Sequence, residues 1–421
     1  MVPDKDLIHV PSQGAWKISI EQTEQAVSFH APSMPLLVLE SIEGGKTPYC
    51  LIRFGPEAFE SCKQLAIKLD ADMLVFSNGS GEALSVQSSE WLDSDALSIA
   101  IGKQFKHFVS HSLEKRCYIC DVSTPRGQIV NGFKDIADFV AMADARGFGR
   151  DSIFYLPGWD GPYDGTYPDY DAWSTAGGKD ELLRLRDVIH DIGGRLVLHL
   201  NHAAVSADRL PDYPELKNAR IKDDKGSWRM WPGATWSGAT QPLYYINPNH
   251  PAWKAVLFSR LERIQGWGIN HLFMDQIGPM GIHSLPDLRL FLTDLRSAFP
   301  KLRVGGESFS TSLQDLVDFW QFWGPPWCGM PALADAEPSD LFFANTQADL
   351  PLFGHLGTPG PLPSLYSWTN FPDIVEHGAK AAFHTACRYH QKVGVRPTIR
   401  INAFRSRDFW PLVEPYLQTA S

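Results

Sequence analysis

The stretch WGINHLFMDQIGPMGIHSLPDLRLFLTDLRSAFPKLRVGGESFS, residues 267–310, follows the pattern strand, loop, helix, strand. Residues 271–274 and 302–305 are short, mostly apolar runs suited to buried parallel strands. Between them, apolar residues recur every three or four positions, as on one face of a helix: Leu285, Leu288, Phe291, Leu292, Leu295 and Phe299. A strand–helix–strand crossover makes the two strands parallel neighbours. Asp275 and Glu307, which end these strands, are therefore expected at the same edge of a sheet.

That edge is where this class of fold carries its chemistry. In α/β folds, ligands bind at the carboxyl ends of the strands. Two carboxyl groups brought together there are what a retaining glycosidase uses, one as nucleophile and the other as acid/base. The first hypothesis is therefore a glycosidase with Asp275 and Glu307 as its catalytic pair.

From residue 113 onward, strand-like and helix-like segments alternate. The expected strands are residues 117–122, 152–156, 195–200, 271–274, 302–305, 341–344, 350–353 and 396–402. The expected helices are residues 133–146, 182–192, 251–266, 285–299, 313–322, 373–389 and 409–417. This alternation predicts an α/β fold, a (β/α)8 TIM barrel over residues 113–421. A doubly wound sheet is the alternative, but no G-x-G-x-x-G turn follows any of the strands.

Residues 1–112 have a different pattern, with short alternating segments separated by turns and little helical period. The expected strands are residues 16–20, 26–30, 36–40, 49–54, 73–76, 84–87, 97–101 and 105–111. Strands at this spacing predict a separate β-sandwich-like domain before the barrel.

The composition limits the classes of partner. The chain has 421 residues, of which 44% are hydrophobic and 20% charged, as in an ordinary globular protein. The formal net charge of −10 argues against nucleic acid as the main partner. No run of about 18 apolar residues occurs, so no membrane span is expected. No basic segment followed by an apolar one opens the chain, so a signal peptide is not visible and a cytoplasmic location is expected. The sequence leaves the oligomeric state open.

Two residue types bear on the kind of ligand. The 14 tryptophans, 12 tyrosines and 24 phenylalanines supply aromatic faces of the kind that stack on sugar rings, which favours a carbohydrate substrate. The six cysteines are scattered, and Cys117 and Cys120 form one C-x-x-C along an expected strand. Without a second pair, buried structural thiols are preferred over a redox or zinc site.

Polar and aromatic side chains follow the expected strands. They are Trp159, Asp160, Tyr163 and Asp164 after the second strand, His199, Asn201 and His202 after the third, Asp275 and Gln276 after the fourth, and Glu307 after the fifth. All except Asp275 and Glu307 are expected to position the substrate, by binding sugar hydroxyls or stacking on the ring. A turn rich in Asp, Gly and Pro also forms without a ligand, so a purely structural role for residues 159–164 stays open.

The two acids have distinct expected roles. An ionised Asp275 can attack an anomeric carbon and form a covalent glycosyl-enzyme. Glu307 follows Gly305 and Gly306, which let the backbone approach closely, and a neighbouring carboxylate raises the pKa of a proton donor. The alternatives are that Asp275 caps a helix or turn, and that Glu307 pairs with an arginine.

The spacing of His199 and His202 is also compatible with a metal site. The two residues face opposite sides of a strand and no further His/Asp cluster lies nearby in the sequence, so hydroxyl binding is preferred and no metal is expected. In the long segment 201–248, several aromatic residues can either wall a sugar subsite or form a small core of their own: Trp228, Trp231, Trp236, Tyr244 and Tyr245.

At Asp275 and Glu307 the chain resembles barrel glycoside hydrolases that use an Asp nucleophile on strand 4 and a Glu acid/base on strand 5. The α-amylase family, the endo-α-N-acetylgalactosaminidases of family 101 and the α-N-acetylgalactosaminidases of family 129 belong to that group. The sequence MDQIG, residues 274–278, is also similar to bacterial glycosidase-like proteins with a β-rich region before such a barrel. The α-amylase family has an arginine two residues before its nucleophile, where this chain has Phe273, so the resemblance is to the other families.

The resemblance covers about residues 116–415 and implies a retaining glycoside hydrolase for an α-linked sugar, needing no cofactor. Two alternatives remain from the sequence. One is a non-catalytic carbohydrate-binding barrel, and the other is a metal-dependent hydrolase using His199 and His202. Neither the sugar nor endo or exo action follows from the sequence.

Overall fold

A computed structural model describes most of the second part of the chain. It covers residues 116–223, 225–231, 242–277, 282–307, 310–313, 315–322, 398–402 and 404–418, with eight separate stretches between residues 7 and 92 and a strand at 364–367. Among the expected elements, residues 97–101, 105–111, 341–344, 350–353 and 373–389 lie outside the described residues.

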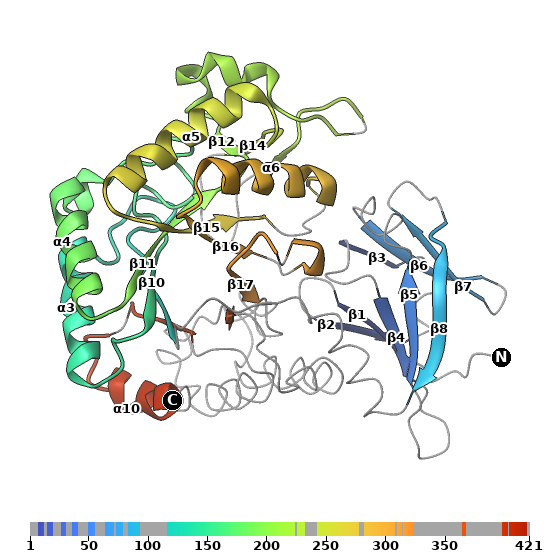
Figure 1. Ribbon diagram of the computed structural model, residues 1–421, viewed down its shortest axis with the longest axis horizontal. Helices are drawn as coiled ribbons and strands as arrows, with labels where there is room; N and C mark the ends of the chain where they lie inside the picture. The colour runs from blue at the N-terminus through green and yellow to red at the C-terminus, as the bar shows by residue number, and fades with distance from the viewer. Residues whose placement is uncertain are drawn as a thin grey trace.

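Eight parallel strands form the central sheet. They are β9 (Arg116–Ile119), β10 (Ser152–Leu156), β11 (Arg195–Asn201), β15 (His271–Asp275), β16 (Arg303–Glu307), β17 (Phe319–Phe322), β18 (Ser364–Ser367) and β19 (Thr398–Arg400). Their order in the sheet is β18-β17-β16-β15-β11-β10-β9-β19, and all neighbouring pairs are parallel. The last strand therefore lies beside the first, which is the order of an α/β barrel. Figure 1 shows the curled sheet.

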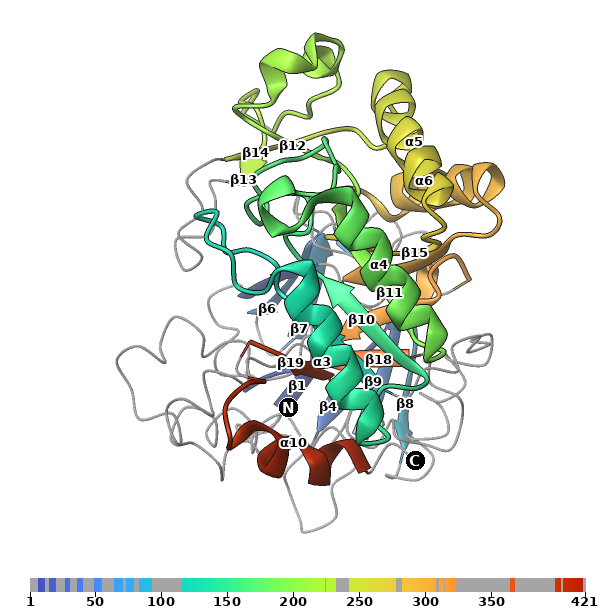
Figure 2. The ribbon, with the colours of Figure 1, turned by 90° about the vertical axis from the view of Figure 1, so that its left-hand side faces the viewer.

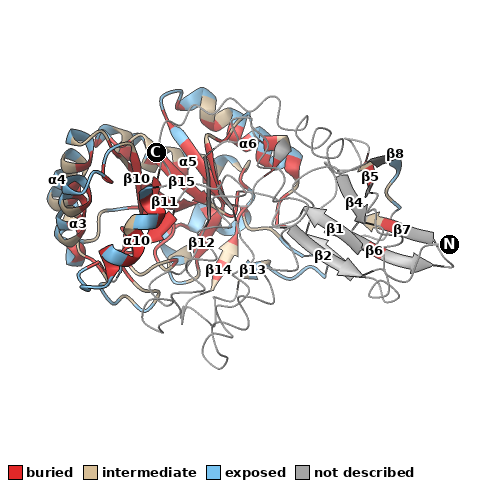
Figure 3. Ribbon diagram, turned by 90° about the horizontal axis from the view of Figure 1, so that it is seen from below, coloured by how far each residue is buried: buried red, intermediate tan, exposed pale blue. Residues whose placement is uncertain are grey.

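Helices pack around the outside of the sheet. They are α3 (Phe133–Ala145), α4 (Gly178–Asp191), α5 (Pro251–Gly266), α6 (Leu285–Ala298) and α10 (Phe409–Leu417). Figure 2 shows α3 and α4 side by side across the strands, and Figure 3 shows their inner faces buried and their outer faces exposed. Within the described ranges, no helix is long and apolar enough to cross a membrane.

The strand side chains alternate between two cores. Those that point into the barrel form one cluster: Cys117, Ile119, Ile153, Tyr155, Val197, Phe273 and Phe319. Their neighbours along the strands, such as Tyr118, Phe154 and Met274, belong to the larger core that also includes the helices. This alternation sends Cys117 and Cys120 to opposite cores, and burial raises the pKa of both thiols. The pair is therefore suited to packing, not to redox chemistry.

The helix expected over residues 313–322 is wrong. The structure has a short 3-10 turn at Thr311–Leu313 and then strand β17. Phe319 and Trp320 are adjacent apolar residues that face opposite cores, as in a strand buried on both sides. The spacing of apolar residues alone does not distinguish such a strand from a helix. Asp318 starts the strand: its backbone N–H donates to the Val304 carbonyl, and its carboxylate accepts from the Val304 N–H at 2.7 Å.

The small sheet after β11 is an element that the sequence did not indicate. It consists of β12 (Ala204–Ser206), β14 (Leu243–Tyr245) and β13 (Met230–Trp231), in that order and antiparallel. Its strands have only two or three residues, too few for an alternating pattern to be read.

The N-terminal part contains two antiparallel sheets. One has the order β2-β1-β4-β5-β8 and the other β3-β6-β7. Their bounds are β1 Leu7–Pro11, β2 Ala15–Ser19, β3 Val27–His30, β4 Leu36–Glu40, β5 Tyr49–Phe54, β6 Gln64–Asp70, β7 Met73–Asn78 and β8 Val86–Leu92. Phe54 of one sheet contacts Phe76 of the other, with 5.5 Å between ring centroids. The β-sandwich-like arrangement and the domain boundary at residue 112 stay predictions.

Candidate active site

The two predicted catalytic acids lie side by side at the end of the barrel. β15 and β16 pair in parallel with Met274 opposite Gly306, so the next residues, Asp275 and Glu307, end neighbouring strands together. Glu307 is only 4% exposed. Glu307 Oε2 accepts a hydrogen bond from the backbone N–H of Gln276 at 2.8 Å, and the negative charge of Glu307 acts on Asp275.

Two glycines before Glu307 make this approach possible. A Cβ at Gly305 would lie 2.0 Å from the Phe319 ring, and one at Gly306 would lie 2.5 Å from Ile277 and 2.8 Å from Trp320. Any larger residue would therefore push β16 away from its neighbours. The glycines fix the position of the strand that carries Glu307.

Burial and mutual repulsion control the protonation of the pair. Burial, followed by the negative charge of Glu307, raises the pKa of Asp275 well above its usual range. Burial also raises the pKa of Glu307, against the lowering effect of its hydrogen bonds with Asp275 and the Gln276 amide. Two carboxyl groups in contact cannot both ionise at low cost, so the pair holds one proton over a wide pH range.

The third strand supplies the groups that hold Asp275. The Asn201 side-chain amide donates to Asp275 Oδ2 at 3.0 Å. His202 Nδ1 lies 2.8 Å from the Asp275 backbone oxygen, and burial lowers the pKa of His202 to about 4. His202 is therefore neutral at ordinary pH and donates from Nδ1. Asn201 and His202, which the sequence predicted to bind substrate, thus both contact Asp275.

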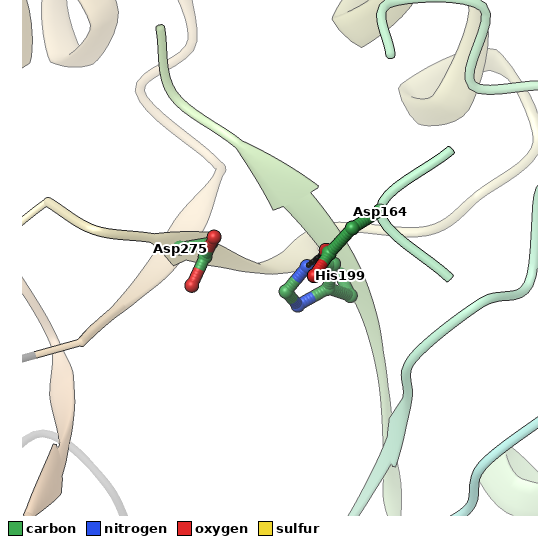
Figure 4. Close-up of side chains that lie close together, drawn as sticks. All are labelled: Asp164, His199 and Asp275. Carbon is green, nitrogen blue, oxygen red and sulfur yellow. Dashed lines mark ion pairs between the residues drawn. The ribbon is translucent and has the colours of Figure 1, made fainter. Parts of the chain in front are cut away.

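On the other side of Asp275 lies a buried group around His199. Its Nδ1 lies 2.5 Å from the Tyr155 hydroxyl and its Nε2 lies 2.7 Å from the Tyr167 hydroxyl, which donates to Asp164 Oδ1 at 2.6 Å. One ligand atom from each of Asp164, His199 and Asp275 lies within 4.8 Å of the others. Figure 4 shows Asp164 and His199 together, with Asp275 across from them.

Opposing effects act on the charge of His199. Burial lowers its pKa, but the close approach of Asp164, with 3.6 Å between Nε2 and Oδ1, and the negative charges of Asp275 and Asp164 outweigh it, so the pKa is raised overall. In return, the charge of His199 favours the ionised form of Asp275. The arrangement therefore supplies positive charge beside the predicted nucleophile.

The predicted residues at 159–163 divide between support and site. The Trp159 indole N–H donates to the His199 carbonyl at 2.8 Å and its side chain is fully buried, so Trp159 supports β11. Asp160 accepts from the Thr166 hydroxyl at 2.9 Å, and burial raises the pKa of Asp160 to about 7. The Tyr163 ring lies 5.2 Å from His199, edge to face, which places it at the site.

A metal held by His199 and His202 does not match the geometry. The two rings do not meet: His199 bonds to two tyrosine hydroxyls, whereas His202 packs against His283, with 5.1 Å between ring centroids. Asp164, His199 and Asp275 are the group that could share an ion. For His199 to ligate it, one tyrosine hydrogen bond would have to break.

Several residues at the site were not singled out from the sequence as functional. Tyr155 and Tyr167 read as core residues, and only the fold brings them to His199. Asp121, next to β9, forms an ion pair with Arg400 of β19, with 2.6 Å between Nε and Oδ2. Their 279-residue separation (400 − 121) gave no local signal.

The aromatic segment after β11 is divided between two sides of the small sheet. Tyr245 is buried and near Asp275 and Glu307, whose charges help to raise its pKa after burial itself. Trp228 and Tyr244 lie under the Arg220 guanidinium, 3.9 and 5.0 Å from their ring centroids. Tyr245 thus belongs to the site, whereas Trp236 lies outside the described residues.

No protein-family profile matches the sequence, and no curated protein sequence matches it. Solved structures do share the fold. The chain aligns with the α-galactosidase TtGalA from Thermus thermophilus, in complex with p-nitrophenyl α-D-galactopyranoside, at a TM-score of 0.61 and 13% identity, over 99% of this chain and 86% of that one.

A second group of similar structures is the α-N-acetylgalactosaminidase NagBb from Bifidobacterium bifidum. The GalNAc complex gives a TM-score of 0.59 at 12% identity over 84% of this chain and 64% of that one. The ligand-free form gives 0.55 at 12% identity over 76% and 61%. The chain thus spans less than two thirds of the length of NagBb. At this level of identity, the comparisons show a common fold.

Proposed function

We propose that this protein is a retaining glycosidase for an α-linked sugar, with Asp275 as nucleophile and Glu307 as acid/base. The observation that carries the proposal is that two carboxyl groups, those of Asp275 and the buried Glu307, end neighbouring barrel strands side by side. Retaining glycosidases hold their carboxyl groups about 5–5.5 Å apart, and inverting enzymes about 6.5–9.5 Å. The two groups end adjacent strands in register, which favours the shorter, retaining spacing.

The proposed reaction has two steps. In the first, an Asp275 oxygen bonds to the anomeric carbon while the bond to the leaving oxygen breaks and Glu307 gives that oxygen its proton. In the second, Glu307 takes a proton from water, whose oxygen bonds to the anomeric carbon and releases Asp275. Two inversions give net retention, and both carboxyl groups return to their starting states.

The choice of sugar rests on the fold neighbours and on the polar groups around Asp275. The similar structures are α-galactosidases and an α-N-acetylgalactosaminidase, so galactose or N-acetylgalactosamine is the proposed glycone. Asp164, His199 and Tyr163 lie on one side of the nucleophile and Gln276 on another, where they can bind ring hydroxyls. Membership of families 101 or 129 is part of this proposal, supported by a Glu on the fifth strand.

A substrate screen tests the proposal. Aryl α- and β-glycosides of galactose, N-acetylgalactosamine and glucose are incubated with the protein and with a folded Asp275→Asn variant. Cleavage of an α-galactoside or α-N-acetylgalactosaminide by the wild type alone is expected. Proton NMR of the first product should show the α anomer. Equal cleavage by the variant, or a β anomer first, would contradict the mechanism.

One observation favours a second candidate, a metal-dependent hydrolase. Asp164, His199 and Asp275 have ligand atoms close enough to share an ion. In that case the purified protein would contain stoichiometric metal, and chelation would abolish hydrolysis. If metal-free protein remains active in the presence of a chelator, the metal-dependent mechanism is excluded and the two-carboxylate mechanism is supported. A barrel that binds the sugar without cleaving any glycoside would instead be a carbohydrate-binding protein.

A further inference from the structure

The residue after the proposed nucleophile has an unusual backbone conformation. Gln276 has φ of 57°, in the left-handed region that side chains other than glycine rarely adopt. For an ordinary L-residue this conformation costs free energy relative to the right-handed regions. Such strain persists only where surrounding contacts hold it, and it is often found at functional sites.

The conformation directs a backbone donor at the proposed acid/base. β15 ends at Asp275, and the N–H of the next residue donates sideways to Glu307 Oε2 at 2.8 Å, across to the end of β16. Glu307 is 4% exposed, so no bulk water competes for that oxygen. The bond therefore fixes the orientation of the Glu307 carboxyl group.

The Gln276 side chain is held as well. It is 8% exposed and lies beside Tyr245 of β14, where it partly opposes the rise in the pKa of the Tyr245 hydroxyl that burial causes. Its Oε1 has no hydrogen-bond partner in the described part of the chain. The backbone hydrogen bond to Glu307 and the burial of the side chain beside Tyr245 both restrain rotation about Gln276.

We propose that Gln276 is a positioning residue whose left-handed backbone selects Glu307 Oε1 as the oxygen that gives and takes the catalytic proton. This inference rests on the proposed function. Oε2 is occupied by the N–H of Gln276, and the oxygen that accepts such a bond is the carbonyl-like one in a protonated carboxyl group. The proton is thus directed to Glu307 Oε1.

Substitutions at Gln276 that differ in their tolerance of positive φ test the proposal. Gln276→Gly and Gln276→Asn accept the left-handed conformation, whereas Gln276→Val disfavours it because of its branched Cβ. All three remove the native amide side chain or shorten it. A difference among them therefore reports on the backbone and not on lost side-chain contacts.

The readout is the dependence of kcat/KM on the leaving group. With the sugar identified by the screen, 2,4-dinitrophenyl and phenyl α-glycosides are compared, because the first leaves without a proton and the second needs one. Gln276→Val is expected to lose about 100-fold or more on the phenyl glycoside, and only a few-fold on the dinitrophenyl glycoside. Gln276→Gly and Gln276→Asn should keep the wild-type ratio between the two substrates.

Asp151 provides a matched control. It also has a left-handed backbone, with φ of 53°, but lies in the turn before β10, away from the two carboxyl groups. Asp151→Val should lower thermal stability without changing the leaving-group ratio. The proposal is overturned if Asp151→Val changes the leaving-group ratio as much as Gln276→Val, or if Gln276→Gly changes that ratio.

Glu307→Gln separates failure of this inference from failure of the proposed function. If Glu307→Gln shows no selective loss on the phenyl glycoside, Glu307 is not the acid and the proposed function fails. If Glu307→Gln shows that loss and Gln276→Val does not, only the positioning role fails. Should Gln276→Val not fold, Gln276→Ala, which disfavours positive φ less strongly, is compared with Gln276→Gly.

Discussion

The rim of the barrel carries two pairs of charged residues on neighbouring strands, and they differ in sign. At β9 and β19, Asp121 faces Arg400 in an ion pair with 2.6 Å between the atoms. At β15 and β16, Asp275 faces Glu307, carboxyl group against carboxyl group. Both pairs lie at the carboxyl ends of adjacent parallel strands: Asp275, Glu307 and Arg400 are the last residues of their strands, and Asp121 follows β9 by two residues.

The difference separates a stabilising contact from a reactive one. Opposite charges neutralise each other, and a nearly buried pair of that kind holds the two strand ends together. At the two acids, burial and then the charge of Glu307 raise the pKa of Asp275, and burial raises the pKa of Glu307, which favours retention of a proton by the pair. That proton is available to a leaving group. The like-charged pair thus has a cost in stability for which the proposed function accounts, and this gives testable contrasts.

The largest effect is expected from Asp275→Asn. Removing the nucleophile should lower kcat/KM on an aryl α-glycoside by about 10⁴-fold or more. It also removes the repulsion within the pair, so the free energy of unfolding should stay equal or rise. Steady-state kinetics and denaturant unfolding measure both. A folded variant with activity within tenfold of the wild type would show that the like-charged pair is not catalytic.

Glu307→Gln should have the next largest effect, and a selective one. Loss of a general acid costs about 10²–10⁴-fold, but only for leaving groups that need a proton. Phenyl glycosides should therefore lose far more than dinitrophenyl glycosides. The variant should also lose the basic limb of the pH–rate profile, which in the wild type follows deprotonation of the pair. A uniform loss on both substrates would point to misfolding or lost binding.

Asp121→Asn is expected to act on stability. The side chains of Asp121 and Arg400 are 11% and 14% exposed, so removing one partner leaves a charge nearly buried. Such a change typically costs about 3–5 kcal/mol of unfolding free energy. Chemical denaturation measures it. The double variant Asp121→Asn/Arg400→Met removes both charges and should recover a large part of the loss; an additive loss would argue against the ion pair.

A smaller effect is expected from Asp160→Asn, and it depends on pH. Burial raises the pKa of Asp160 to about 7, above its unfolded value of about 3.9. Its contribution to stability is therefore complete below about pH 4 and is lost as the pH rises toward about 7. Asparagine cannot ionise, so the variant should gain stability relative to the wild type between pH 5 and about 8. If the unfolding midpoints of the wild type and the variant change in parallel with pH across that range, the raised pKa of Asp160 is contradicted.

The strand ends of the barrel were predictable from the sequence because each follows a short buried run. Asp275, Glu307 and His199 could be placed at one rim by counting strands, and β15 and β16 appear where the apolar runs predicted them. Helix α10 was likewise expected at its observed bounds. In these segments the period of the apolar residues matches the element that they form.

What the sequence could not indicate depends on contacts between distant segments. β17 lies within residues 313–322, which were expected to be helical, whereas pairing with β16 decides its conformation. The tyrosines at His199, the ion pair of Asp121 and the approach of Tyr245 to the acids arise from strands and loops that are distant in the sequence and that only the fold brings together. The type of a residue alone does not predict which distant residue it will contact.

Chemical rescue tests the central claim most directly. In Asp275→Gly, azide can enter the space left by the carboxylate and attack a dinitrophenyl α-glycoside from the face that Asp275 uses. We expect negligible turnover without azide, a rate that rises with azide concentration, and a β-glycosyl azide as product. Absence of rescue in the folded variant, or an α-glycosyl azide, would contradict Asp275 as the nucleophile of a retaining enzyme.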